Sequence, residues 1–308
     1  MPASPGPGSG FTLATARWPQ VEAAARRVLV VPVGSLEQHG PHLPLDTDTR
    51  IAVAVAERAC AELAVGGRTG AGLAPPIAIG ASGEHADFPG TLSIGHVALS
   101  TLLVELGRHA SLHWPAMLLV NGHGGNVTAI RDALATLRAE GRDCRVWHAG
   151  IRPSLPDGSP PPGASSPGLG IDAHAGRVET SLMLSLAPGD VRLDLAAPGD
   201  KRPLTEIMAD LRAHGVRKVS PNGVLGDPAG ASAAEGEHLL ALLVADLTAT
   251  LDLLLLSGRA FKAVPPVPAL RLAPAVFRRD GASRRRRAAS GRSAWRSSRR
   301  SPGWIPRR

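Results

Sequence analysis

Histidines and carboxylates gather in a short segment that follows an apolar run. Glu37 and His39 are two residues apart, and Asp48 stands eleven residues after Glu37. In extended backbone, residues two apart project to the same side, so Glu37 and His39 can share one site. Carboxylate oxygens and imidazole nitrogens together suit Zn, Mn or Fe. We interpret the segment as a set of metal ligands; the alternative is a polar loop with solvated charges.

Two further segments carry side chains of the same kind. His123 lies in a glycine-rich stretch, 121–126, and glycines allow a backbone to approach a ligand or metal closely. This stretch lacks the Lys-Ser/Thr pair of a phosphate-binding P-loop and the spacing of a dinucleotide fingerprint. His174 and Glu179 are five apart at the expected start of a helix, where both can face one site. An acidic residue is also ordinary at a helix start, so capping is the alternative for Glu179.

Strands and helices alternate along the chain. Continuous apolar runs predict buried strands, and periodic apolar residues predict helices. The expected strands are 28–33, 73–79, 116–120 and 145–148, and the expected helices are 49–65, 96–112, 126–140, 175–186, 204–214 and 232–257. This order predicts an α/β fold whose mostly parallel sheet has helices on both faces. Sites in such sheets form at the carboxyl ends of strands, where the first two segments fall.

Composition divides the chain into three parts. Residues 1–17 are predicted to be a flexible arm, 18–258 one domain, and 259–308 a Pro/Arg-rich, disordered tail. The formal net charge is +8, but residues 278–308 hold twelve Arg against one acid; that is +11 and leaves −3 for residues 1–277. The basic character therefore belongs to the tail, and the domain itself is not expected to bind nucleic acid.

Other features are those of a soluble cytoplasmic protein. The only two cysteines, Cys60 and Cys144, lie in apolar stretches and are expected to be buried thiols in a reducing compartment. The first ten residues contain no apolar run behind a basic start, so no signal peptide is expected. The most apolar stretch, 238–257, is interrupted by Asp246 and Asp252, which favours a core helix over a membrane span.

Taken together, the three segments resemble the motifs of the creatininase family of metal-dependent amidohydrolases. The likeness covers roughly residues 28–256 and has the motifs in the right order. It implies a three-layer αβα sandwich and hydrolysis of non-peptide or unusual amides. It also implies two divalent metal ions (Zn, Fe or Mn) and a homo-oligomer, commonly a hexamer.

The resemblance also assigns roles to individual residues. Glu37 and His123 match ligands of one metal, His39 matches a ligand of the other, and Asp48 matches the carboxylate that bridges them. His174 matches the histidine that faces the substrate. The implied reaction is attack of a metal-bridging hydroxide on the scissile carbonyl, with His174 as a donor to the leaving amine.

One position departs from creatininase itself, which has a glutamate where this chain has Gly125. The departure weakens the case for creatinine as the substrate. Family members with glycine there retain the glutamate that matches Glu179. We therefore expect Glu179 to complete the shell of the second metal.

A narrower resemblance is carried by two more segments. Residues 80–91 (Gly-Ala-Ser-Gly-Glu-His-Ala-Asp-Phe-Pro-Gly-Thr) and 220–228 (Ser-Pro-Asn-Gly-Val-Leu-Gly-Asp-Pro) are similar to the mycofactocin-system branch of the family. That branch implies a peptidase that releases a modified C-terminal dipeptide from a short, ribosomally made precursor peptide. His42, Ser82 and His85 are the expected substrate-binding residues, and support of the metal ligands is the alternative for the two histidines.

Two other functions stay open at this point. One is hydrolysis of a small cyclic amide or a formamide. The other is nucleic-acid binding through the Arg-rich tail, where Trp295 and Trp304 are the aromatics among the arginines of 278–308; a disordered extension is the preferred interpretation. Nothing marks Ser35, Ser82 or Thr91 as a nucleophile.

Overall fold

One parallel sheet organises the part of the chain that the computed structural model describes, residues 11–25, 27–149 and 172–256, all within the compact unit Met1–Val267. The order across the sheet is β1 (Phe11–Thr12), β3 (Ala71–Leu73), β2 (Val28–Val33), β4 (Ala116–Asn121) and β5 (Asp143–His148). Every neighbouring pair of these strands is parallel. The predicted α/β fold class is therefore confirmed.

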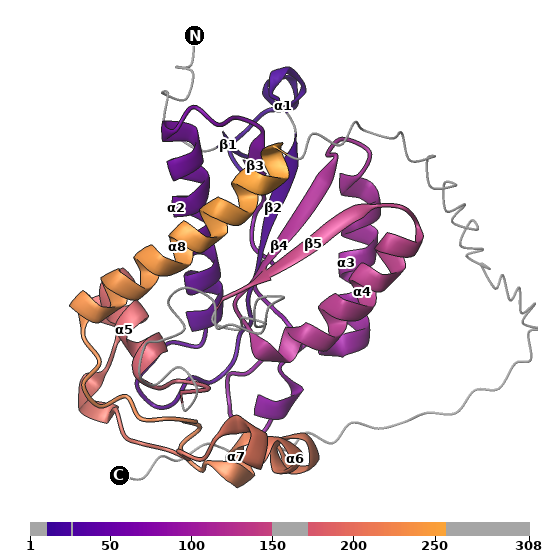
Figure 1. The fold of residues 1–308 in the computed structure, drawn as a ribbon. Helices are drawn as coiled ribbons and strands as arrows, with labels where there is room; N and C mark the ends of the chain where they lie inside the picture. Colours follow the sequence, from indigo (N-terminus) through magenta and orange to yellow (C-terminus); the bar gives the residue numbers. More distant parts are fainter. Residues whose placement is uncertain (1–10, 26, 150–171, 257–308) are drawn as a thin grey trace, which may run out of the picture. The chain divides into compact units, whose positions relative to one another are not determined.

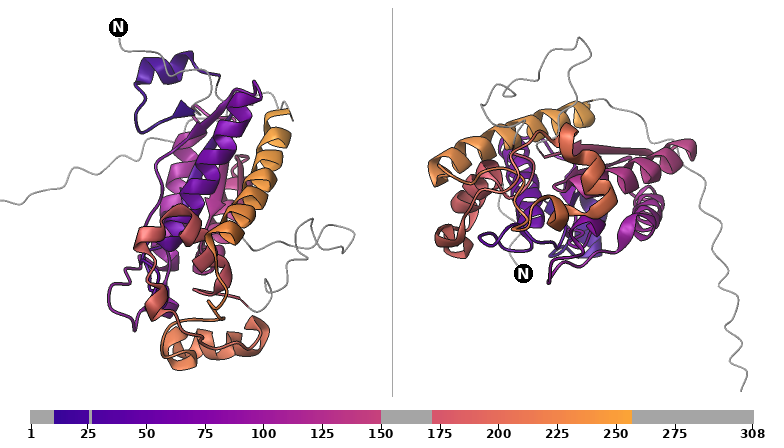
Figure 2. Two further views of the ribbon diagram at one scale, coloured as in Figure 1. Left: turned by 90° about the vertical axis from the view of Figure 1, so that its left-hand side faces the viewer. Right: turned by 90° about the horizontal axis from the view of Figure 1, so that it is seen from below.

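Helices cover both faces of this sheet and make a three-layer sandwich (Figures 1 and 2). One layer contains α2 (Thr47–Val65), α5 (Arg177–Leu186) and α8 (Ala233–Leu256), and the other contains α3 (Gly95–Ala110) and α4 (Val127–Ala139). The sheet packs against the α2, α5 and α8 layer in a first hydrophobic core and against the α3 and α4 layer in a second. Along β2, the side chains of Val28 and Val30 lie in the first core, whereas those of Leu29 and Val31 lie in the second. Because strand side chains alternate between faces, a strand buried on both sides needs a continuous apolar run.

Shorter elements complete the description. They are α1 (Trp18–Ala23), α6 (Leu204–His214), α7 (Val216–Val219) and the 3₁₀ turns η1 (Gly83–His85), η2 (Gly124–Asn126), η3 (Pro188–Asp190) and η4 (Leu193–Leu195). Helices α6 and α7 share a small core of their own, which includes Ile207 and Val216. Both also contact η1, so this small unit supports one of the loops that carry site residues.

The predicted strand 73–79 is wrong over most of its length. Strand β3 ends at Leu73, although the chain continues beside β2: Ala74 N–H donates to Val30 O and Ile77 N–H donates to Pro32 O, both at 2.9 Å. Between them stand Pro75 and Pro76. Proline has no N–H for the ladder, which explains why the strand stops before them.

The predicted flexible arm needs a correction within 11–17. Phe11 and Thr12 form β1, which pairs with β3 at the edge of the sheet, and Phe11 packs against the second core. The strand forms because the edge of β3 offers unpaired backbone groups and an apolar side chain is available to cover the core. Residues 1–10, the predicted loop 153–170 and the predicted tail 259–308 lie outside the described residues.

Helix α8 has the length and composition of a membrane span, which core helices of soluble proteins also show. It packs against α2 and α5 and contributes Leu240, Val244 and Leu247 to the first core. The two acids that interrupt its apolar sequence have partners: Asp246 accepts the indole N–H of Trp147 at 2.7 Å, and Asp252 pairs with Arg68 at 2.7 Å. The helix is thus packed as the core element that its sequence predicted.

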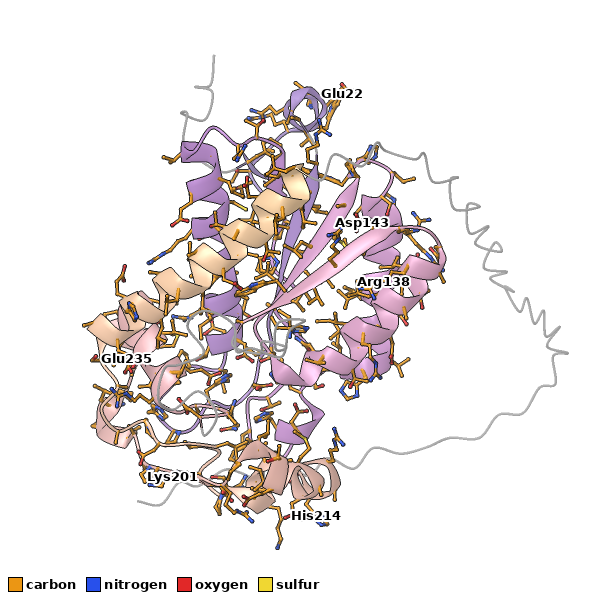
Figure 3. All side chains as sticks on the ribbon, viewed as in Figure 1. Glu22, Arg138, Asp143, Lys201, His214 and Glu235 are labelled. Atoms are coloured by element: carbon orange, nitrogen blue, oxygen red, sulfur yellow. The ribbon has the colours of Figure 1, made fainter. Side chains whose placement is uncertain are left out.

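Charged side chains are distributed unevenly between surface and interior. Glu22, Arg138 and Lys201, which are labelled in Figure 3, are exposed at the periphery. Among the described residues, buried ionisable side chains are concentrated in the segments singled out above; Arg142 is an exception and pairs with Glu140 at 2.9 Å. Burying charge costs free energy unless it is paired, so this concentration marks a functional site.

Candidate metal centre

The site forms where two adjacent strands end. In the register of the sheet Val33 lies opposite Asn121, so the segments that follow β2 and β4 leave the sheet at the same level. The first segment brings Glu37 and His39, and the second brings His123 two residues after Asn121. Side chains that are 86 positions apart in the sequence meet because the two strands are parallel neighbours.

Asp48 lies at the centre of the first two segments. It sits in the first turn of α2, is 2% exposed, and accepts a hydrogen bond from the Ser35 hydroxyl at 2.7 Å. Its Oδ1 is 3.2 Å from His39 Nε2, and its Oδ2 is 3.1 Å from His123 Nδ1. A carboxylate in contact with two imidazoles at the positive end of a helix matches the position expected of a shared ligand.

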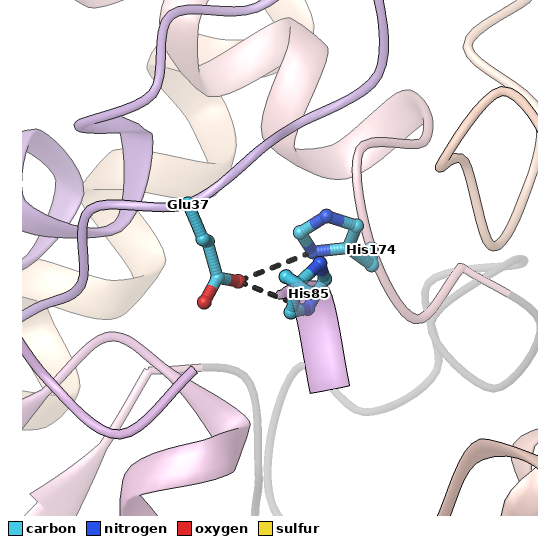
Figure 4. Close-up of side chains that lie close together, drawn as sticks. All are labelled: Glu37, His85 and His174. Atoms are coloured by element: carbon cyan, nitrogen blue, oxygen red, sulfur yellow. Dashed lines mark ion pairs between the residues drawn. The ribbon is translucent and has the colours of Figure 1, made fainter. Parts of the chain in front are cut away.

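Glu37 is buried with neither carboxylate oxygen in a hydrogen bond. Three histidine nitrogens surround it. His123 Nε2 is 3.0 Å from Oε2. Figure 4 shows the other two, His85 Nε2 and His174 Nδ1, which are 3.3 and 3.8 Å from Oε1. Burial raises the pKa of Glu37 to about 7, against the opposing effect of His123. Buried polar groups normally have partners, and a cation among these nitrogens would supply the missing one.

The third segment reaches the same place from α5. Glu179 lies in the first turn of this helix, and one ligand atom each of His39, His174 and Glu179 lie within 4.8 Å of one another. Glu179 Oε2 accepts the Ala175 N–H at 2.6 Å. Ala175 has φ +53°, a conformation that favours glycine, and it is the one non-glycine residue with positive φ in the described part of the chain. The strain accompanies the sharp turn between His174 and α5.

The site attracts positive charge even without an ion. Burial alone would lower the pKa of His39 and of His123. The charge of Asp48 outweighs burial at His39, and the charges of Glu37 and Asp48 together outweigh it at His123. The pKa of each histidine is therefore raised to about 10. The pKa of Asp48 is lowered well below its usual value despite burial, because of His39 and His123. A divalent ion would replace the protons on these histidines, as metal binding to imidazole requires. The donor set therefore fits a divalent metal.

Two other histidines of the site are neutral. Burial lowers the pKa of His85 to about 3, and burial together with His39 lowers the pKa of His174 well below its usual value. Neutral imidazoles carry one hydrogen each, so their roles depend on which nitrogen bears it.

Gln38 determines where those two hydrogens are. Its Nε2 donates to Gly223 O at 3.1 Å, and its second hydrogen is directed at His85 Nδ1 at 2.8 Å. The hydrogen of His85 is then on Nε2, toward Glu37. His174 Nε2 donates to the backbone oxygen of Gln38 at 2.8 Å, which leaves the lone pair of His174 Nδ1 facing Glu37. Gln38 is thus a buried positioning residue for both rings.

The other predicted site residues differ in their distance from the proposed metal ligands. Ser82 is buried with Oγ 3.5 Å from His123 Nε2, at the centre. His42 is turned to α5, where its Nε2 lies 2.9 Å from Thr180 Oγ1. Sequence reasoning gave no role to Gln38 or to Glu84, whose Oε1 is 3.5 Å from His123 Nε2. The sequence offered one indication of their involvement, because each is adjacent in sequence to a predicted site residue.

A family model with the description "Creatininase: Creatinine amidohydrolase" matches residues 14–251. The chain belongs to the creatininase family. The mycofactocin precursor peptide peptidase of Mycolicibacterium smegmatis is 50% identical over 237 residues, which are 77% of this chain and 87% of that protein.

Solved creatininase structures share the fold. A mutant creatininase described as Zn-Zn type matches with a TM-score of 0.61 and 27% identity, over 78% of this chain and 96% of that one. A structure described as creatininase Mn matches with a TM-score of 0.60 and 27% identity, over 79% and 97%. The resemblance to the creatininase family is therefore confirmed, and with it the sandwich architecture.

Proposed function

We propose that this creatininase-family hydrolase removes the modified C-terminal dipeptide from the mycofactocin precursor peptide in a metal-dependent reaction. Family membership supports a hydrolytic enzyme, and the relative at 50% identity supports the peptide substrate. The observation that carries the chemistry is Glu37, a buried carboxylate without hydrogen bonds among three histidine nitrogens.

The residues divide into two ligand sets and a shared carboxylate. Glu37 and His123 would hold one divalent ion, His39 and Glu179 would hold the other, and Asp48 contacts one histidine of each set. Zn, Fe and Mn all suit this mixture of oxygen and nitrogen donors. When bound, such ions supply Lewis-acid activation of water and of the scissile carbonyl.

We assign to His174 the transfer of a proton to the leaving amine. Its Nε2–H is held by the backbone oxygen of Gln38, so Nδ1 is free to accept a proton on the side of Glu37. The lowered pKa makes the resulting imidazolium a strong acid, ready to protonate the leaving amine. We assign contact with the peptide to Ser82 and His85, whereas His42 contacts Thr180 of α5. The enzyme acts in the cytoplasm as a homo-oligomer, a hexamer by family resemblance.

The test uses purified protein stripped of metal, then reloaded with Zn²⁺, Fe²⁺ or Mn²⁺ in separate samples. Each sample is offered the modified precursor peptide, creatinine and a formamide, and products are identified by mass spectrometry. We expect release of the dipeptide from the precursor in a reloaded sample and no cleavage by stripped protein. Full activity of protein shown by elemental analysis to be metal-free would overturn the metal chemistry. Turnover of creatinine or the formamide without dipeptide release would overturn the peptide substrate.

A further inference from the structure

Glu84 brings a third carboxylate to the site from outside the three ligand segments. It lies in η1, and its Oε1 is 3.5 Å from His123 Nε2, the same nitrogen that is 3.0 Å from Glu37 Oε2. Its side chain is 29% exposed, whereas those of His123 and Glu37 are 6% and 0% exposed. Glu84 therefore lies at the rim of the site, and its carboxylate faces inward.

Gly125 leaves the space that this carboxylate fills. A Cβ at position 125 would overlap with Glu84 Oε1, with the backbone oxygen of Ala81 and with His123 Nε2. Gly125 has no positive φ, so its backbone does not require glycine there. The absence of a side chain instead leaves room for the backbone oxygen of Ala81 and for Glu84 Oε1 beside His123 Nε2.

The separation between Glu84 Oε1 and His123 Nε2 fits a shared ion. Two ligand atoms at about 2.0–2.2 Å from one tetrahedral zinc ion lie roughly 3.3–3.6 Å apart. His123 Nε2 and Glu84 Oε1 are already at such a distance, with Glu37 Oε2 on the same nitrogen. The loop that carries Glu84 is supported from behind, because a Cβ on Gly215, between α6 and α7, would lie 3.0 Å from Glu84 O.

We propose that Glu84 is an additional ligand of the divalent ion held by Glu37 and His123, at the position that Gly125 leaves open. The inference rests on the proposed function, since it concerns the same metal centre. It assigns to η1 a further donor for that ion, beside Glu37, His123 and the shared Asp48, and it places this donor next to Gly125.

The experiment titrates Zn²⁺ into metal-free protein by calorimetry, with metal content checked by elemental analysis. Wild type should bind two ions per chain. Glu84→Gln keeps the shape of the side chain but loses its charge, and should weaken one of the two sites by about 10- to 100-fold and leave the other unchanged. Glu84→Asp, which is shorter, should weaken the same site. Asp87→Asn, an exposed acid three residues on, is the matched control and should bind like wild type.

Each outcome separates the possibilities. Two unchanged Zn²⁺ sites in Glu84→Gln, with or without a higher KM for the peptide, would overturn the assignment while the proposed function stands. Wild type that binds no Zn²⁺ would overturn both. Because Glu84 is partly exposed, the variants should fold; equal melting temperatures of the metal-free proteins verify this, and Glu84→Asp provides a second variant if Glu84→Gln fails.

Discussion

At the scale of the residue, neighbouring carboxylates differ in what surrounds them. Asp48 is 2% exposed and contacts His39 and His123, whereas Asp46, two residues earlier, is partly exposed and pairs with Arg50 at 2.8 Å. Two side chains of the same type therefore offer a matched comparison. Only the buried one lies among the proposed metal ligands.

We expect Asp48→Ala to lower metal content from two ions per chain toward one or none and to reduce kcat/KM by more than about 100-fold. Asp46→Ala should keep both ions, because its carboxylate pairs with Arg50 at the surface and an exposed ion pair contributes little. Elemental analysis and steady-state kinetics on the two variants provide the measurement. If Asp46→Ala lost metal and Asp48→Ala retained it, the assignment of Asp48 as the shared ligand would be wrong, and Asp46 would take its place.

Glu179 allows charge to be separated from hydrogen bonding. Glu179→Gln retains an oxygen that can accept the Ala175 N–H, now 2.6 Å from Oε2, so the turn before α5 should persist. The lost charge should lower the occupancy of one metal and strongly reduce turnover. Metal analysis beside thermal melting of the stripped proteins tests this. A capping residue without a metal role would show a lower melting temperature and unchanged metal content.

At the scale of the element, the contact between α5 and α8 holds Glu179 in place. Gly236 in α8 is buried, and a Cβ there would overlap with the backbone oxygen of Ser181 in α5. Helix propensity favours alanine over glycine by only about 1 kcal/mol, whereas overpacking a rigid backbone contact costs about 1–3 kcal/mol or more. Sterics should decide the outcome.

Gly236→Ala should therefore lower the free energy of unfolding, and it should also weaken metal binding because α5 must move. Gly189→Ala is the control, since a Cβ on Gly189 meets nothing within 4 Å. Denaturant unfolding and metal titration of both variants give the answer. A more stable Gly236→Ala would mean that α8 shifts easily and does not fix the position of α5.

At the scale of the whole molecule, the two thiols are enclosed in different layers. Cys60 lies in the first core and Cys144 in the second, and burial raises the pKa of each to about 12. A thiol with a raised pKa stays protonated and unreactive at ordinary pH. We expect a thiol reagent at pH 8 to modify neither cysteine in the native protein and both after denaturation. Rapid modification of the native protein would show that a core layer opens readily.

The charge of the chain also separates into parts. Removing residues 277–308 takes away +11 and leaves the retained chain at −3. Because the site lies within residues 37–179, the truncated protein should keep its metal content and its kcat/KM. Binding to nucleic acid, which depends on basic residues and weakens with salt, should be confined to the full chain. Loss of peptide hydrolysis on truncation would instead assign the Arg-rich segment a catalytic or assembly role.

The sequence by itself determined most of the local elements and pointed to most of the proposed donors. The apolar run 28–33 is β2, the run 116–120 lies within β4, and the periodic segment 204–214 is α6, because local periodicity reports burial directly. The motifs that follow β2 and β4 pointed to Glu37 and His123. Their meeting could be anticipated, since parallel strands end at the same edge of a sheet.

Only the tertiary structure decided which other side chains join them. Strand β1 pairs beside β3, because strand pairing depends on which backbone groups a distant segment leaves free. Glu84 and Gln38 look like ordinary loop residues in the sequence. Their contacts with His123 and His174 depend on the separations between loops, and no local pattern encodes a distance across the fold.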